Sequence, residues 1–578
     1  MTMHHPAMEA GRRHRYVPNL WDAFAFGLLF GGLILLVHGG HDTLAPIVSL
    51  EASPVSLDPA RLPEYALRTT MRMLAAIVAS LVFTFAYGAL AAKSRRAEMV
   101  LIPLLDILQS VPVLGFLSFT VVGFMALFPG RVLGVELASI FAIFTAQAWN
   151  MTFSFYQSLK TVPRDLDEAT RSFRLSGWQR FWRLEVPFSM PGLVWNTMMS
   201  MSGGWFFVVA SEAISVGNTT ITLPGVGSYV ALAIEQQNLA AVGWAVAAML
   251  AVILIYDQLL FRPLVAWGDK FRVEQSASGA APRSWLLDAV RRTRLFQILL
   301  APVGSVLSAI PRQRLQLPAA RSAQAGTAGA GAWAERAWLA LVILASAYTL
   351  WLIASFVATE LSWSDVGEVV GLGLLTMLRV VVLMALATVI WVPVGVWIGL
   401  RPRVAERVQP LAQFLAAFPA NIVFPFAVVV IVRLGLNPDI WLSPLMVLGT
   451  QWYILFNVIA GASAFPNDLK EAAATFRIRG WNWWRKVILP GIFPYYVTGA
   501  VTASGGSWNA SIVAEVASWG DTRLTAHGLG SYIAQATAAG DYPRIVLGIA
   551  VMSLFVILFN RLLWRPLYAF AGRRLRLD

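Results

Sequence analysis

The chain has 578 residues, of which 57% are hydrophobic and 13% are charged, and its mean hydropathy is +0.64. A soluble domain carries roughly 25% charged residues, so this composition excludes an ordinary soluble protein and indicates an integral membrane protein. The net charge of +13 does not indicate a nucleic-acid-binding protein, because the basic residues cluster beside apolar segments.

Twelve apolar segments follow one another along the chain, each close to the ~20 residues that a helix needs to cross the hydrocarbon core. Long continuous apolar runs predict helices and not a barrel. The segments of the first half lie near residues 21–38, 69–92, 100–127, 134–158, 187–214 and 241–261. Those of the second half lie near residues 335–357, 371–400, 408–432, 440–462, 490–515 and 544–563. The sequence therefore predicts an all-α integral membrane protein with about twelve transmembrane helices. The first segment is long enough to be kept as a membrane helix and not cleaved as a signal peptide.

Lysine and arginine gather in alternate loops. With a cytoplasmic N-terminus, the basic inner segments are 12–15, 93–96, 160–183, 401–407, 470–486 and the tail after 561. Among the outer segments, 39–65 contains only Arg61, and 215–240 and 358–370 contain neither residue type. This asymmetry predicts that both termini lie in the cytoplasm. The N-terminal tail holds His4, His5 and His14, for which a solvated tail is favoured over a metal site, and the lack of cysteine excludes thiolate metal sites and disulfides.

The predicted organisation is a tail (1–20), a first repeat (21–268), a basic cytoplasmic linker (269–333) and a second repeat with a basic tail (334–578). An even number of spans in each half makes these parallel repeats. Residues 284–300 of the linker mix apolar side chains with arginines. Two interpretations stay open for this segment: an amphipathic helix bound to anionic membrane lipid, or a partly ordered tether that ends in a flexible small-residue tract.

A polar, helix-prone segment interrupts each half. The second copy follows the first by 303 residues (471 − 168), with Glu, Phe-Arg, Gly-Trp and Pro in the same places. The matched residues are Glu168, Ala169, Phe173, Arg174 and Gly177 in the first half and Glu471, Ala472, Phe476, Arg477 and Gly480 in the second. A solvated loop would not need the apolar positions, so each segment is predicted to be a short helix that docks on a soluble partner. Its glutamate would accept a charge-assisted hydrogen bond from that partner.

The two segments resemble the coupling motif of binding-protein-dependent ABC importer permeases: Glu-Ala-Ala, three residues, Gly, nine residues, Ile, one residue, Leu-Pro. The second copy matches it at Glu471, Ala472, Ala473, Val487, Leu489 and Pro490, and the first at Glu168, Ala169, Leu184 and Pro187. The glycine expected six residues after the glutamate is Arg174 or Arg477, and a glycine follows three residues later. The turn is therefore expected to be shifted, and the two arginines are expected to add contacts with the ATPase.

Further likeness lies in the fifth segment of each half, where Trp205 and Glu212 recur as Trp508 and Glu515. This resembles the nitrate, sulfonate, taurine and bicarbonate group of permeases. The resemblance implies a type I importer fold in the bacterial inner membrane. It also implies an extracytoplasmic substrate-binding protein and two ATPase subunits, which bind the ATP and Mg. The cargo would be a small anion, with ferric iron or another solute as the alternative. Because the halves are fused, one chain would supply the whole pore.

Polar residues inside predicted spans are candidates for the translocation path, because such residues are costly in the membrane. They are Arg72, Gln109, Gln147, Glu212, Arg379, Gln413 and Glu515. For the arginines the alternative is an outward reach to lipid headgroups, and for the glutamates it is a structural hydrogen bond.

The chain has no Gly-x-x-x-x-Gly-Lys-Ser/Thr motif, and no nucleophile or metal constellation stands out, so we expect a transport subunit with no cofactor of its own and not an enzyme. An ion-coupled secondary transporter is a distant alternative that would place carboxylates near the middle of its spans.

Overall fold

The computed structural model describes residues 19–40, 45–47, 54–110, 113–216, 219–271, 284–313, 328–358, 360–463 and 465–574. The predicted N-terminal tail with its histidines, up to residue 18, lies outside these ranges, as does most of the small-residue tract of the linker. Two compact units are distinguished: one comprises Met1–His38, Val162–Val194 and Tyr256–Ala319, and the other comprises Gly39–Thr161, Trp195–Ile255 and Ala320–Asp578.

The described chain is almost entirely helical, as predicted. The first half contains α1 (Leu20–Gly40), α3 (Leu62–Lys93), α4 (Arg95–Ser110), α5 (Val113–Leu127), α6 (Val132–Lys160), α7 (Arg164–Ser172), α8 (Gly177–Arg180), α9 (Val186–Glu212), α10 (Val226–Glu235), α11 (Leu239–Tyr256) and α12 (Arg262–Gly268). The linker contains α13 (Trp285–Arg292) and α14 (Leu295–Ala309). The second half contains α15 (Ala328–Val357), α16 (Trp363–Gly399), α17 (Pro402–Ala417), α18 (Phe424–Arg433), α19 (Pro438–Trp441), α20 (Leu445–Leu448), α21 (Gln451–Ser463), α22 (Asn467–Thr475), α23 (Trp481–Trp483), α24 (Leu489–Ala514), α25 (Leu529–Ala539), α26 (Tyr542–Phe559) and α27 (Arg565–Arg574).

Seven helices within the described residues are long and apolar enough to cross a membrane, or eight if a pair bent by 43° counts as one span. The twelve predicted spans are therefore not confirmed as twelve continuous helices. The predicted span 408–432 is wrong as a single helix, because α17 ends before Phe418 and α18 begins at Phe424. Pro419 accounts for the break, since a residue that precedes proline is disfavoured in the helical conformation. The predicted span 440–462 is divided among α19, α20 and α21, and the 43° bend lies between α20 and α21.

Two short antiparallel hairpins add to the predicted all-α fold. Strand β1 (Ala213–Val216) pairs with β2 (Thr219–Thr222), and β3 (Val516–Trp519) pairs with β4 (Thr522–Thr525). The first hairpin directly follows α9, and the second follows α24 after Glu515; they lead into the short helices α10 and α25. The two hairpins are 303 residues apart (516 − 213), which is the spacing of the sequence repeat.

The same spacing recurs in irregular features of the backbone. A π-helical turn precedes α9 in the first half, at Phe181–Glu185, and α24 in the second half, at Trp484–Ile488. A second π-helical turn lies at Asp257–Phe261 and again at Asn560–Trp564. The buried Trp205 and Trp508, each 1% exposed, are also matched. A π-helical turn is rare in proteins, so its recurrence at one offset shows that the halves share their detailed geometry as well as their motifs.

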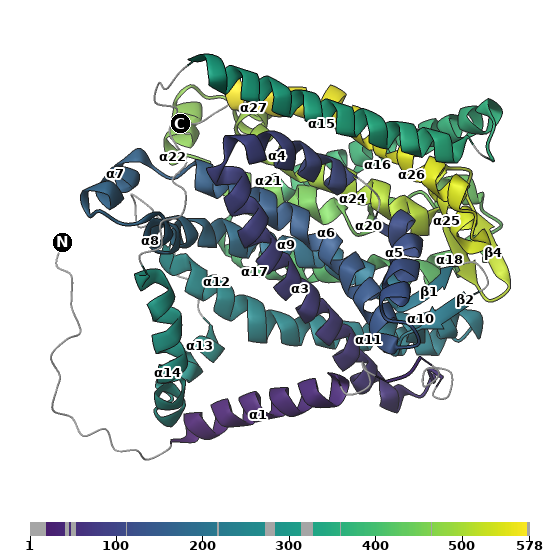
Figure 1. The fold of residues 1–578 in the computed structure, drawn as a ribbon, viewed down its shortest axis with the longest axis horizontal. Helices are drawn as coiled ribbons and strands as arrows, with labels where there is room; N and C mark the ends of the chain where they lie inside the picture. The colour runs from purple at the N-terminus through teal and green to yellow at the C-terminus, as the bar shows by residue number, and fades with distance from the viewer. Residues whose placement is uncertain are drawn as a thin grey trace. The chain divides into compact units, whose positions relative to one another are not determined.

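In the larger unit, helices of both halves share one apolar core. Val113, Leu117 and Val121 of α5 belong to the same buried cluster as Trp508, Ile512 and Val551. Direct hydrogen bonds join the halves as well: the Val113 N–H donates to Asn509 Oδ1 at 2.8 Å, and Asn421 Nδ2 donates to the Phe206 carbonyl at 3.2 Å. In Figure 1, α5 of the first half lies near α25 of the second, which it contacts. The second repeat therefore packs directly against the first within a single chain.

In the smaller unit, the linker forms ordered helices against the N-terminal helix. The Asp22 carboxylate of α1 accepts the Arg294 N–H at 2.8 Å, and Asn19 donates to the Arg292 carbonyl at 2.7 Å. The Phe24 and Trp285 rings meet at 6.0 Å. Residues 285–292 and 295–309 of the linker are helical, and the linker contacts α1, which differs from the interpretation as a partly ordered tether. That α13 and α14 lie on the inner leaflet remains a prediction.

The cysteine-free chain permits a direct test of the predicted orientation. The exposed Arg403, in the first turn of α17, is predicted to be cytoplasmic, and the exposed Asp521, at the tip of the β3–β4 hairpin, is predicted to be outside. In intact cells, a membrane-impermeant maleimide should label Asp521→Cys and should leave Arg403→Cys unlabelled until the membrane is opened. Labelling of Arg403→Cys in intact cells would contradict the orientation.

Candidate functional site

The first polar segment forms the short helix α7, as the sequence predicts. Pro163 precedes the helix, and Asp165 and Asp167 lie in its first turn, where negative charge interacts favourably with the helix dipole. Asp167 also pairs with Arg171 and with Arg180, each at 2.8 Å. The second of these pairs ties α7 to α8 and so fixes the turn between them.

The two short helices end in the same unusual turn. The Leu175 N–H donates to the Thr170 carbonyl at 3.1 Å, and the Ile478 N–H donates to the Ala473 carbonyl at 2.9 Å. These bonds define a Schellman motif, in which the residue after the helix cap adopts the left-handed conformation. That residue is Arg174 (φ 50°) in one copy and Arg477 (φ 51°) in the other. Glycine usually occupies this position, because the conformation costs an ordinary residue about 1–2 kcal/mol.

This geometry corrects one expectation from the sequence. The motif comparison predicts a turn shifted to the glycines at 177 and 480, but the turn lies six residues after each glutamate, where the family motif has its glycine. Arg174 and Arg477 adopt the left-handed conformation themselves. Gly177 begins α8 behind the Ser176 capping box, and Gly480 has a positive φ of 58° with ψ −135°, a conformation that favours glycine.

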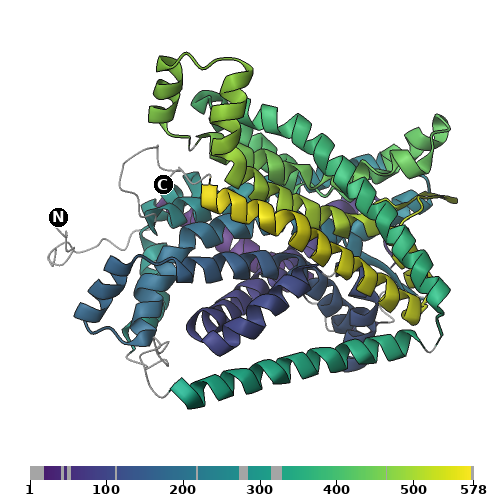
Figure 2. The same ribbon diagram turned by 90° about the horizontal axis from the view of Figure 1, so that it is seen from above.

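The two helices present the same outward face. The exposed residues on this face are Glu168, Ala169, Phe173 and Arg174 in the first copy and Glu471, Ala472, Phe476 and Arg477 in the second. Phe173 is 78% exposed and Phe476 is 77% exposed. Thr170 and Ala473 lie on the buried side. Figure 2 shows the light-green segment that contains α22 projecting from the ends of the neighbouring long helices. An exposed phenylalanine next to exposed charged residues is typical of a protein-binding surface, and this chain has two such sites.

A second pair of matched sites, in the larger unit, lies where α9 and α24 end. In the first half, Arg72 of α3 is buried, with 3% of its side chain exposed. Its Nε and Nη2 donate to the two oxygens of Glu136 at 2.6 and 2.7 Å, and its Nη1 donates to Glu212 at 2.7 Å. The guanidinium therefore lies between two carboxylates, and this geometry does not fit the alternative of a side chain that reaches lipid headgroups.

The Glu212 carboxylate, which is fully buried, receives further hydrogen bonds. Thr69 Oγ1 donates to it at 2.6 Å, and the Gly227 N–H in the first turn of α10 donates at 2.6 Å. A Cβ atom at Gly225, the residue that caps α10, would collide with this carboxylate. The hairpin and the glycine thus bring a helix N-terminus directly onto a buried negative charge, where its N–H groups are available.

The second half repeats this arrangement with weaker burial. Arg379 donates to Glu515 and to Asp439, each at 3.1 Å. Thr376 Oγ1 donates to Glu515 at 2.8 Å, and the Ser531 N–H donates to the same carboxylate at 3.0 Å. Asp439 also accepts the backbone N–H of His527 at 2.7 Å. The Arg379 side chain is 13% exposed and that of Asp439 is 37% exposed, against 3% for Arg72 and 11% for Glu136.

The remaining path candidates lie elsewhere. Gln147 is buried between α6 and α3, where its amide donates to the Met73 sulfur at 3.0 Å. Gln109 is exposed on α4, and the side chain of Gln413 on α17 lies outside the described part of the chain. The acids Glu136 and Asp439 are not among the residues predicted from the sequence. Their signal is present there, because they are also 303 residues apart (439 − 136).

Comparisons with known proteins point in one direction. A family model described as binding-protein-dependent transport system inner membrane component matches residues 84–262 and again 391–575. A bicarbonate transport system permease protein of Synechococcus elongatus is 28% identical over 178 residues, which are 31% of this chain and 60% of the relative. A nitrate import permease protein of Leptolyngbya laminosa is 26% identical over 186 residues, 32% of this chain and 62% of that protein. A glycine betaine/proline betaine transport system permease protein of Escherichia coli is 31% identical over 190 residues, 33% of this chain and 50% of that protein. The chain thus matches half to three fifths of the length of these relatives.

The two charge clusters predict unequal effects of one substitution. Arg72→Gln leaves the buried carboxylates of Glu136 and Glu212 without their cation, so the free energy of unfolding should fall by about 3–5 kcal/mol. Arg379→Gln should cost less, because Asp439 is partly exposed and keeps its bond from His527. Thermal unfolding of the purified protein in detergent measures both, with the exposed Arg403→Gln as the control. Equal losses for the two variants would contradict the stronger structural role of Arg72.

Proposed function

Because the chain belongs to the family of binding-protein-dependent transport system inner membrane components, whose model matches both halves, we propose that it is the complete membrane-spanning permease of an ATP-driven ABC importer. In this proposal one chain forms the substrate pathway. Two ATPase subunits dock on α7 and α22, and an extracytoplasmic binding protein delivers the substrate. ATP and Mg are bound by the ATPase and not by this chain.

The duplicated outward face of α7 and α22 carries this proposal. Each copy has an exposed phenylalanine that can serve as an apolar anchor. The motif glutamate lies five residues before this phenylalanine, and an arginine in the strained left-handed conformation directly follows it. A soluble partner that binds one copy would bind the other with the same contacts. Two equivalent docking sites fit two copies of one ATPase.

The second half supplies a continuous route for mechanical coupling. After α22 the chain passes through α23 and the π-helical turn Trp484–Ile488 into α24, whose last turn leads to Glu515. A displacement of α22 is therefore applied to one end of the helix that ends at the charge cluster. We place the hinge at the π-helical turn, since such turns often mark functional sites. A cycle of ATPase closure and opening would then alternate the access of the cavity.

We propose a small anion such as nitrate, a sulfonate or bicarbonate as the cargo. Two of the relatives are described as bicarbonate and nitrate permeases, which favours this class, while the betaine permease keeps a zwitterion among the alternatives. Arg72 and Arg379 are each engaged by two carboxylates. We therefore assign Arg72, Glu212, Arg379 and Glu515 to shaping the path and leave selectivity to the binding protein. A ferric or other cationic ligand on that protein would overturn the anion assignment.

An ion-coupled secondary transporter is the rival from another class. It has no use for two exposed, matched cytoplasmic helices, whereas an ATPase-driven permease requires them. Its other hallmark would be carboxylates near the middle of spans, but Glu212 and Glu515 lie at the ends of their helices.

Substitution of both motif glutamates tests the docking role. Glu168→Ala with Glu471→Ala removes two charge-assisted contacts, so ATPase co-purification should weaken by about tenfold or more, or ATP hydrolysis should become independent of the binding protein. Both glutamates are exposed, so the fold should survive. The matched control is Asp165→Ala with Asp468→Ala, which changes exposed acids on the same helices outside the motif. Normal assembly and substrate-stimulated hydrolysis in the glutamate double variant would refute the docking role.

A further inference from the structure

A cavity of about 460 Å³ lies in the second half, within the larger unit. It is bounded by α16, by the start of α24 with the turn before it, and by α27. Its lining consists of Thr388, Val392, Arg485, Leu489, Pro490, Ile492, Phe493, Tyr496 and Phe570. Its volume falls within the ~300–1,000 Å³ typical of ligand sites.

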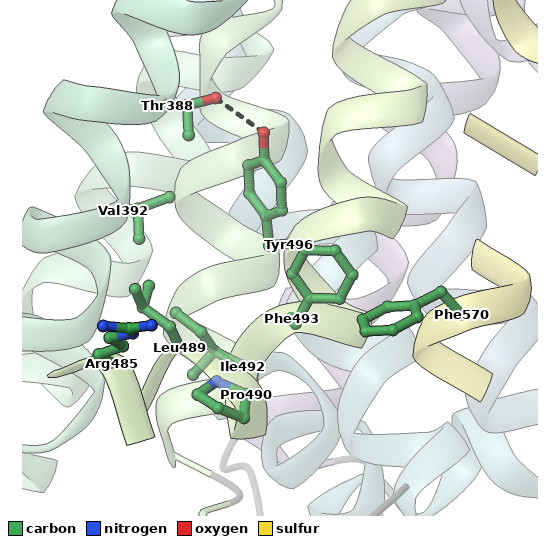
Figure 3. A pocket seen from close by; sticks show the side chains of 9 residues that line it. All are labelled: Thr388, Val392, Arg485, Leu489, Pro490, Ile492, Phe493, Tyr496 and Phe570. Carbon is green, nitrogen blue, oxygen red and sulfur yellow. Dashed lines mark hydrogen bonds between the residues drawn. The ribbon is translucent and has the colours of Figure 1, made fainter. Parts of the chain in front are cut away.

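The charged group and the hydroxyl groups of the lining lie at opposite ends of the cavity. Figure 3 shows Arg485 at one end, next to Leu489, and the hydroxyl groups of Thr388 and Tyr496 at the other, with Val392 between them and the Phe493 and Phe570 rings to one side. Those two hydroxyls satisfy each other at 3.0 Å, and Thr388 also donates to the Met384 carbonyl at 2.7 Å. Both hydroxyl protons are used in these bonds, so this end offers a ligand no free hydrogen-bond donor. Because these hydroxyls bond to each other, this end of the cavity can contact the hydrocarbon part of a ligand.

Arg485 is the charged residue of the lining, and among the described residues no ion pair or hydrogen bond engages its guanidinium. The exposed Arg485 lies in the π-helical turn Trp484–Ile488. Trp481, Trp483 and Trp484 surround it in sequence, and tryptophan is enriched where membrane helices meet the headgroup layer. A cation that has no partner among the described residues and borders a largely apolar cavity is complementary to an anionic amphiphile.

We propose that this cavity binds an anionic phospholipid of the leaflet that faces α22, with its phosphate on Arg485 and an acyl chain along Leu489, Phe493 and Val392. The shape of the site excludes a small inorganic anion as the intended ligand, because such an anion would leave the apolar cavity unfilled. A neutral lipid would fill the cavity without using Arg485.

Three of the residues that line the cavity differ at the equivalent positions of the first half. At the equivalent positions of the first half, Trp182 replaces Arg485, Leu193 replaces Tyr496 and Trp267 replaces Phe570. The first half therefore has no cation at the position equivalent to Arg485, and we expect the lipid to bind only in the second half. Because its phosphate lies on the turn that joins α22 to α24, the lipid is positioned to affect movement at this turn in one half and not the other.

Lipid retention by the purified full-length chain tests the proposal. Native mass spectrometry after mixing with equal amounts of dioleoylphosphatidylglycerol and dioleoylphosphatidylcholine should show preferential retention of the anionic lipid. Arg485→Gln should reduce retention of the anionic lipid about fivefold and leave that of the neutral lipid unchanged. Leu489→Trp, which narrows the cavity, should reduce both. The matched control is Lys486→Gln, because Lys486 is an exposed neighbour outside the lining.

Three results would overturn the proposal. The first is equal retention of the anionic lipid by Arg485→Gln and the unaltered protein. The second is an equal loss in Lys486→Gln, which would indicate a diffuse basic surface. The third is displacement of the anionic lipid by inorganic phosphate alone, which would indicate a small-anion site.

Discussion

A buried carboxylate at the end of α9, with its counterpart directly after α24, is the constraint on which this end of each half depends. Removing such a charge from water is costly unless it is paired and hydrogen-bonded. Glu212 meets this requirement with a threonine and an arginine from α3 and a backbone N–H from α10. The hairpin after α9 returns the chain so that this N–H can reach, and Gly225 leaves the necessary space. Glu136 then balances the arginine from a third element. One charge thus specifies how four elements meet, and Glu515 does the same in the second half.

The turns after α7 and α22 carry a cost of another kind, which is backbone strain. Arg174 and Arg477 occupy a left-handed conformation that glycine would adopt without strain. Both copies have this arrangement, together with an exposed phenylalanine at the preceding residue. Local strain of this sort is typical of functional positions. For the second half we infer that the strained turn presents the docking face, that the π-helical turn Trp484–Ile488 provides the hinge, and that α24 connects both to Glu515.

The sequence predicts the helical class, the duplication and the two short polar helices, because hydropathy and a fixed offset are visible without coordinates. It does not predict the broken third span of the second half, although Pro419 is its visible cause. The pairing of Arg72 with Glu136 is also not predicted, since it depends on how α3 and α6 lie side by side and not on any local pattern. The position of the turn after each short helix is predicted wrongly, because glycine is the usual residue for such a turn. In the structure, backbone hydrogen bonds hold the turn around an arginine.

The halves share their geometry but have diverged in detail: the first has the more deeply buried charge cluster, and the second has the cavity beside its hinge. The two halves of a fused chain can differ in this way, because each half always assembles with the other and never with a copy of itself. We therefore propose that one chain of 63.2 kDa supplies the whole pore. The mass of the transport-competent complex, purified with its ATPase, tests this directly. One copy of this chain with two copies of the ATPase is the predicted result, and two copies of this chain in each functional complex would contradict it.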